Sequence, residues 1–221
     1  MKTLKVLIAA TAIVISQAQA APTIPQGLIT EEVYLDIPGD QVSDLIGSSK
    51  FQNGTPDLVN SRTSFEYAAG GLDSTFYAHT YDNSGARMAG YFYPPTSGDY
   101  TFWIAADDTA ILYLSTDENP AHKSQIASVP SWWFGRAYTH NPSQQSAPVS
   151  LIQGNVYYIE ALMKENWGGE HVSVSIDGAS PIPGSYLSPL GAVPEPSTCL
   201  AGIAALSMLA MSIRANRKHR A

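Results

Sequence analysis

The chain has 221 residues, of which 44% are hydrophobic and 14% are charged, with 17 Gly, 15 Pro and a single Cys. These values fit one globular domain with added segments, and they exclude a disordered chain, a coiled coil and an intramolecular disulfide scaffold. The formal net charge is −7, which argues against nucleic acid as a partner because polyphosphate binding needs a basic surface.

The first twenty residues have the three parts of a secretory signal peptide. Lys2 and Lys5 precede a short apolar run, and a small-x-small site follows at 18–20. The run is too short to cross a bilayer. We expect a signal peptide over 1–20 and a mature chain from Ala21, the alternative being a buried N-terminal helix.

The charge balance becomes more acidic once both ends of the chain are set aside. Between residues 21 and 193 there are six Lys or Arg and 18 Asp or Glu, which gives a net charge of −12. Such a surface repels nucleic acid and anionic lipid, and it suits divalent cations or neutral partners.

Short strand patterns separated by turn residues follow one another along the middle of the chain. Apolar and polar residues alternate in 100–104 and in 172–176, which is typical of half-buried strands. Strands are expected over 32–37, 62–67, 86–93, 99–106, 110–115, 124–129, 149–151, 155–164 and 171–176. Residues 41–47 are expected to form one helical turn capped by Asp40. Regular strands without long helices predict an all-β fold, an antiparallel barrel or sandwich.

Two segments with distinct compositions follow the strands. Residues 179–192 are rich in Pro, Gly and Ser and are expected to form a linker. After them, Pro194-Glu195-Pro196 precedes the apolar stretch 197–213, and the chain ends in a basic cluster. The apolar stretch is at the short limit for a membrane helix, and the basic end would stay cytoplasmic.

The order of these parts over 193–221 closely resembles the PEP-CTERM sorting signal of exported bacterial proteins. The resemblance implies cleavage by an exosortase near Pro194-Glu195-Pro196, with transient anchoring by a C-terminal hydrophobic transmembrane helix, in a bacterium that makes exopolysaccharide. A plain membrane anchor is the alternative. Cys199 lies inside this tail, so we assign it no catalytic role.

The strand region carries a second resemblance. The segments 91–108 (YFYPPTSGDYTFWIAADD), 110–115 (AILYLS), 151–161 (LIQGNVYYIEA) and 164–169 (KENWGG) look like the core of the PA-14, or protective-antigen-type, domain. The matched span runs from about Gly27 to Ile176, so we expect one PA-14-like β domain over 21–178. The resemblance implies a carbohydrate-binding or adhesion module, whose sugar-binding members act through calcium.

Two adjacent carboxylates, Asp107 and Asp108, end one of the predicted strands. Calcium prefers several oxygen ligands, so the pair is a candidate hard-cation and ligand-binding site. Neighbouring side chains on a regular strand point to opposite faces, so both reach one ion only if the backbone bends between them. The resemblance implies that this bend is a cis peptide bond. The alternative is a structural turn in which the aspartates bond to the backbone.

A third ligand would come from the loop after residue 164. The resemblance implies Asn166 as a metal ligand, although here it directly precedes Trp167, unlike in the family pattern. Glu165 and Glu170 flank it and could substitute as oxygen ligands, and the alternative for Asn166 is a plain turn residue. Trp167 is a candidate to stack on a sugar ring, ahead of Trp133, the alternative being ordinary packing.

Motifs of the common enzyme classes are absent from the sequence. There is no Gly-x-Ser-x-Gly, His-Glu-x-x-His, phosphate loop or dinucleotide fingerprint, and the five His residues are scattered. We therefore predict a non-catalytic module, sorted to the cell surface or extracellular matrix, that binds a glycan or exopolysaccharide through calcium. A structural matrix protein with no sugar pocket is the alternative, and a glycan hydrolase is less favoured.

Overall fold

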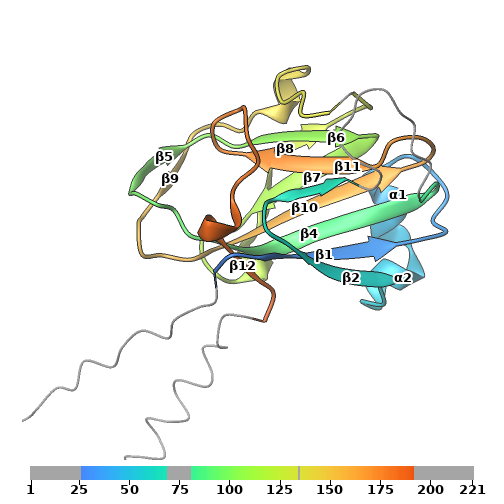
Figure 1. Cartoon of the computed structure of the whole chain (residues 1–221), viewed down its shortest axis with the longest axis horizontal. Coiled ribbons are helices and arrows are strands. Elements are labelled where there is room, and N and C mark those ends of the chain that lie inside the picture. The colour runs from blue at the N-terminus through green and yellow to red at the C-terminus, as the bar shows by residue number, and fades with distance from the viewer. Residues whose placement is uncertain (1–25, 69–80, 134, 192–221) are drawn as a thin grey trace, which may run out of the picture.

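The structure is a computed structural model that describes residues 26–68, 81–133 and 135–191 (Figure 1). The expected signal peptide over 1–20 and the sorting signal over 193–221, with its hydrophobic helix and Cys199, lie outside the described residues. Within the described ranges, no helix is both long enough and apolar enough to cross a membrane.

Antiparallel pairing joins all the strands, and the predicted all-β fold is confirmed. The strands are β1 (Ile29–Tyr34), β2 (Leu58–Arg62), β3 (Glu66–Ala68), β4 (Ser84–Phe92), β5 (Gly98–Tyr100), β6 (Trp103–Asp107), β7 (Thr109–Leu114), β8 (Ser124–Val129), β9 (Val149–Leu151), β10 (Tyr157–Glu165), β11 (His171–Ser175) and β12 (Leu187–Pro189). A seven-stranded sheet has the order β2-β1-β4-β10-β7-β8, with β12 also paired to β4. A second sheet has the order β3-β11-β6, and β5 pairs with β9.

The two larger sheets form a sandwich with one shared core. Alternate residues of the long central strands point inward, among them Met88 of β4 and Ile159 of β10, and both are fully buried. They belong to the same apolar cluster as Ile104 of β6 and Val174 of β11 in the smaller sheet. Burial of this cluster is the main force that holds the two layers together.

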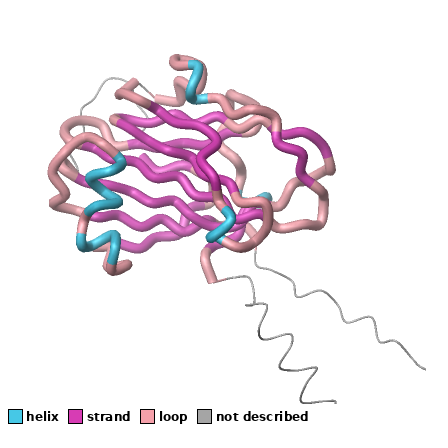
Figure 2. The backbone as a smooth tube through the Cα atoms, turned by 180° about the vertical axis from the view of Figure 1, so that it is seen from behind, coloured by secondary structure: helices cyan, strands magenta, loops and turns pink. Residues whose placement is uncertain are grey.

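Two short helices cover part of the outer face of the seven-stranded sheet (Figure 2). These are α1 (Val42–Gly47) and α2 (Ser49–Gln52). Leu45 is buried in a second apolar cluster that includes Leu162 of β10. The helical turn is where the sequence predicted it, but its N-cap is Gln41 rather than Asp40. Asp44 accepts a hydrogen bond from the backbone N–H of Gln41 at 3.0 Å. A side chain of the first helical turn therefore caps the start of the helix.

The sequence predicts a linker over 179–192. The structure corrects this prediction, because much of the segment packs on the domain. Ile182 and Leu187 are fully buried, and β12 pairs with the central strand β4. The proline-rich composition suggested a spacer, but prolines at the edges of a sheet do not prevent pairing through the remaining residues. The short helices η1 (Pro120–His122), η2 (Pro142–Gln144) and η3 (Gly184–Tyr186) complete the described elements.

A charged network lies on the outer face of β4 and β10. Arg87 donates from Nε to Oε2 of Glu160 at 3.0 Å and from Nη1 to Oε2 of Glu32 at 2.9 Å. Lys123 donates to Oε1 of Glu160, whose side chain is 1% exposed. Burial alone would raise the pKa of Glu160, but Arg87 and Lys123 outweigh burial and the pKa is lowered. The two cations, together with a hydrogen bond from the Tyr158 hydroxyl, therefore keep this buried carboxylate ionised.

We predict that Arg87→Met lowers the free energy of unfolding by about 3 kcal/mol, because it leaves Glu160 buried with half of its compensation. Urea unfolding at neutral pH measures the change. The control is Lys50→Met, which removes the pair with Asp57 in which both side chains are about one third exposed, and it should cost less than about 1 kcal/mol. Equal losses in the two variants would contradict the assignment.

Candidate functional site

Two chain connections meet at one end of the sandwich. The turn from β6 to β7 holds Asp107 and Asp108, and the loop from β10 to β11 spans residues 166–170. Each connection passes from one sheet to the other. Since β10 pairs with β7 and β11 pairs with β6, the register places Lys164 opposite Thr109 and His171 opposite Asp107. The two connections therefore lie side by side.

Three carboxylates converge where these connections meet. Asp107, Asp108 and Glu165 each offer a carboxylate oxygen, and these oxygens all lie within 4.8 Å of one another. The peptide bond between Asp107 and Asp108 is cis, as the family resemblance implied. The sequence predicts Glu165 only as a substitute for Asn166, whereas the structure places its carboxylate in the cluster. Its position in the alternation of β10, in phase with inward-facing Met163, was the available signal.

Burial and like charge act together on these acids. Burial first, then the neighbouring Asp108 and Glu170, raises the pKa of Asp107 to about 7. Burial, with the charges of Asp108, Asp107 and Glu170, raises the pKa of Glu165 to about 9, although the nearby backbone of Trp167 lowers it slightly. The site therefore lacks positive charge for its number of acids, and a cation would relieve the repulsion.

The positively charged side chain of Lys164, near the acids, donates its hydrogen bonds to backbone carbonyl groups. Lys164 is buried, and its ammonium group donates to the carbonyl oxygens of Gly39 and Glu165, each at 2.6 Å. Burial raises the pKa of Asp108, which the backbone of Asn166 and the charge of Lys164 partly offset. Lys164 thus fixes the backbone around the acids without an ion pair to any of them in the part of the chain that the structure describes.

The donor set fits a hard divalent cation. Both carboxylate oxygens of Glu165 are buried, and neither has a hydrogen-bond partner of normal geometry among the described residues. A buried carboxyl oxygen without a hydrogen-bond partner is costly whether or not it is ionised, so these atoms point to a ligand. Three carboxylates and no nitrogen or sulfur donors in the group favour calcium or magnesium over zinc or copper.

The loop after β10 is shaped to approach the acids. Asn166 is exposed, and its backbone N–H donates to Oδ2 of Asp108 at 3.1 Å. Gly168 has φ of +125°, where a side chain would be strained. A Cβ on Gly169 would lie 3.3 Å from Oδ2 of Asp107. The two glycines therefore let the loop lie against Asp107, while the metal-ligand role of the Asn166 side chain stays a prediction.

The candidate aromatic residues are on the surface. Trp167 is 64% exposed and sits next to Asn166 in the loop that faces the acids. Trp132 and Trp133 are 47% and 39% exposed and stack on each other, and Trp133 also stacks on His140 with ring centroids 3.6 Å apart. None of the three tryptophans is a core residue. Contact of Trp167 with a sugar stays a prediction.

Comparison with known proteins identifies the fold family. The model of the PA14 domain family matches residues 32–182. Among solved structures, the PA14 domain of the MpAFP antifreeze protein is 17% identical, with a TM-score of 0.50, over 80% of this chain and 100% of that one. The Epithelial Adhesin 6 A domain from Candida glabrata, in complex with Galb1-3GlcNAc, is 17% identical over 76% of this chain and 89% of that one, with a TM-score of 0.48.

Curated relatives share only part of their length with this chain. N-acetyl-beta-glucosaminyl-glycoprotein 4-beta-N-acetylgalactosaminyltransferase 1 of Mus musculus is 36% identical over 97 residues, which is 42% of this chain and 9% of that protein. Fibrocystin of Canis lupus familiaris is 37% identical over 83 residues, 34% of this chain and 2% of that protein. The chain thus spans a small share of both relatives, so the match describes a module that they contain.

We predict that Asp107→Asn stabilises the protein by about 1 kcal/mol when divalent cations are absent, because it removes an ionised carboxylate from a crowded cluster of three acids. Urea unfolding in chelator at pH 8 measures the change. Glu118→Gln is the control, since Glu118 is an exposed acid beyond the opposite end of β7, and it should change stability by less than about 0.5 kcal/mol. Destabilisation by Asp107→Asn would show that the acids are structural hydrogen-bond acceptors instead.

Proposed function

We propose that this chain, which belongs to the PA14 domain family, is a carbohydrate-binding module that uses a cation held by Asp107, Asp108 and Glu165. The observation that carries the proposal is the convergence of three carboxylate oxygens within 4.8 Å, at an end of the sandwich where Glu165 is fully buried. Crowded carboxylates of this kind are relieved by protonation or by a bound cation, and a divalent cation can serve all three acids at once.

The proposed cation is calcium, and the residues have separate tasks around it. When bound, calcium would supply open coordination positions that neutral hydroxyl groups can occupy. Asp107, Asp108 and Glu165 would provide the negative charge, with Asn166 as a further oxygen ligand at the exposed rim. Trp167, in the same loop and 64% exposed, would lie against the apolar face of a sugar ring.

Binding rather than hydrolysis is the proposed activity. Glycosidases hold two carboxylates about 5–10 Å apart on either side of the bond that they cleave. Here the three acids converge on one point within 4.8 Å, which suits a shared ion better than a pair of groups flanking a substrate. The acidic domain, with a net charge of −12 over residues 21–193, favours a neutral glycan over an anionic one.

A structural role without a sugar pocket is the second candidate. Asp108 accepts the backbone N–H of Asn166 at 3.1 Å, which is the kind of bond that a structural turn requires. A carboxylate has further lone pairs, so this bond and cation binding are compatible. The buried oxygens of Glu165, which a turn does not need, favour the cation.

We also propose that the protein is exported and sorted to the cell surface or extracellular matrix through its two ends. The supporting features are the signal-peptide pattern over 1–20 and the PEP-CTERM-like order of Pro-Glu-Pro, apolar stretch and basic cluster over 193–221. Exosortase would cleave near Pro194-Glu195-Pro196. The intact mass of the exported protein tests this, and a species that retains residues 197–221 after export would contradict it.

A glycan array probed with the full-length chain tests the function. We predict binding in millimolar calcium, its loss in excess chelator, and a fall in affinity of at least about 10- to 100-fold for Asp107→Asn and for Asp108→Asn. Glu118→Gln should bind like the unaltered protein, because Glu118 is an exposed acid beyond the far end of β7. Glycan binding that persists in chelator would rule out the cation mechanism.

A further inference from the structure

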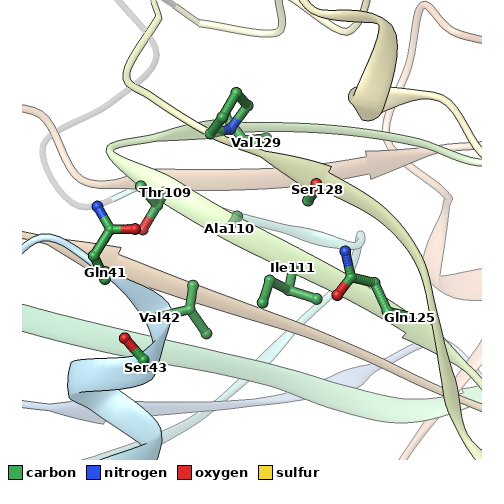
Figure 3. Close-up of a pocket in the computed structure, with 10 residues that line it drawn as sticks. Gln41, Val42, Ser43, Thr109, Ala110, Ile111, Gln125, Ser128 and Val129 are labelled. Atoms are coloured by element: carbon green, nitrogen blue, oxygen red, sulfur yellow. The ribbon is translucent and has the colours of Figure 1, made fainter.

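An uncharged groove lies on the outer face of β7, between the start of α1 and strand β8. Its volume is about 310 Å³, and none of its ten lining residues is charged. Gln41, Val42 and Ser43 form one wall, Gln125 and Ser128 of β8 form the other, and Ile111 lies on the floor. In Figure 3, Gln41 and Thr109 lie at one end of the groove and Gln125 lies at the other.

One end of the groove lies close to the carboxylate cluster. Thr109, which lines the groove, directly follows Asp108 in the chain, and its hydroxyl donates to the carbonyl oxygen of Asp40 at 2.6 Å. The charge of Asp40 acts on Asp108 and helps to raise its pKa. Lys164, beside the cluster, donates to the carbonyl of Gly39. Residues 39–43 therefore run from the surroundings of Asp108 and Lys164 to the groove wall, so the groove lies close to the cluster.

The lining has the chemistry of a site for a neutral, hydroxyl-rich ring. Gln41 and Gln125 are exposed, and each side-chain amide can both donate and accept hydrogen bonds. Ile111 is half-buried, so it presents an apolar surface on the floor between the polar walls. An uncharged lining within a domain that is otherwise strongly acidic does not attract a second cation. A volume near the lower end of the small-ligand range has room for one sugar unit and not for a long chain.

We propose that this groove is a subsite for the second sugar unit of a neutral glycan whose first unit is held at the Asp107–Asp108–Glu165 cluster. The inference rests on the proposed function and adds to it a preference for disaccharides over monosaccharides. Gln41 and Gln125 hydrogen-bond to hydroxyl groups of the second sugar, and Ile111 contacts its ring. The groove therefore affects the preference for glycan length and does not affect cation binding.

Matched sugar pairs and groove variants test this with the full-length chain in calcium. The probes are lactose against galactose, maltose against glucose, and N,N′-diacetylchitobiose against N-acetylglucosamine, with affinities measured by calorimetry. Ser128→Trp fills the groove, and Gln125→Ala removes one exposed amide without added bulk. Ser124→Trp is the matched control, because Ser124 is exposed on the same strand and does not line the groove.

We expect at least one disaccharide to bind about tenfold more tightly than its monosaccharide. Ser128→Trp should abolish that preference while leaving monosaccharide affinity unchanged, Gln125→Ala should reduce it about threefold, and Ser124→Trp should preserve it. Equal affinities within every pair, or a preference that survives both groove variants, would overturn the subsite while sparing the cation site. Absence of binding to every mono- and disaccharide would instead overturn the proposed function, and this inference with it.

Discussion

The chain crosses from one sheet to the other twice at the same end of the sandwich. The site depends on these two crossings. β6 and β11 pair in the smaller sheet, while β7 and β10 pair in the larger one. The connection from β6 to β7 and the connection from β10 to β11 must therefore cross between the layers at the same place. Three acids near these crossings are held together by pairing along whole strands, so their mutual repulsion cannot separate them without breaking sheet hydrogen bonds.

The stability for this arrangement comes from elsewhere in the molecule. The shared apolar core is continuous across both sheets, and the Arg87–Glu160 network shows how the same fold treats a buried carboxylate that must be neutralised by protein groups. At Asp107, Asp108 and Glu165 the described cation nearby, Lys164, is hydrogen-bonded to backbone carbonyls and offsets the raised pKa of Asp108 only in part. The buried Glu160 is thus part of a structural ion network. The cluster of Asp107, Asp108 and Glu165 has the features of a site that binds an ion.

The sequence predicts most of the fold and part of the site, and the limits have physical causes. The strands expected over 124–129 and 149–151 have the observed bounds, whereas the strand expected over 99–106 is divided into β5 and β6. β12 could not be predicted, because the three prolines in and near it give the segment the composition of a linker. Asp107 and Asp108 are adjacent in the sequence and carry the family pattern, so they could be identified without a structure. The alternation along β10 marks Glu165 as inward-facing, but its place beside Asp107 and Asp108 depends on the long-range register of β10 against β7. The groove likewise requires α1 to lie beside β8, which local patterns do not encode.

Calcium titration by calorimetry tests the central claim most directly, with the full-length chain compared with its Glu165→Gln variant. The account predicts one calcium site per chain in the unaltered protein, a fall in affinity of at least about tenfold in Glu165→Gln, and no change in Glu118→Gln. No binding of calcium by the unaltered chain, or equal binding by Glu165→Gln, would contradict the claim that these three carboxylates hold a cation.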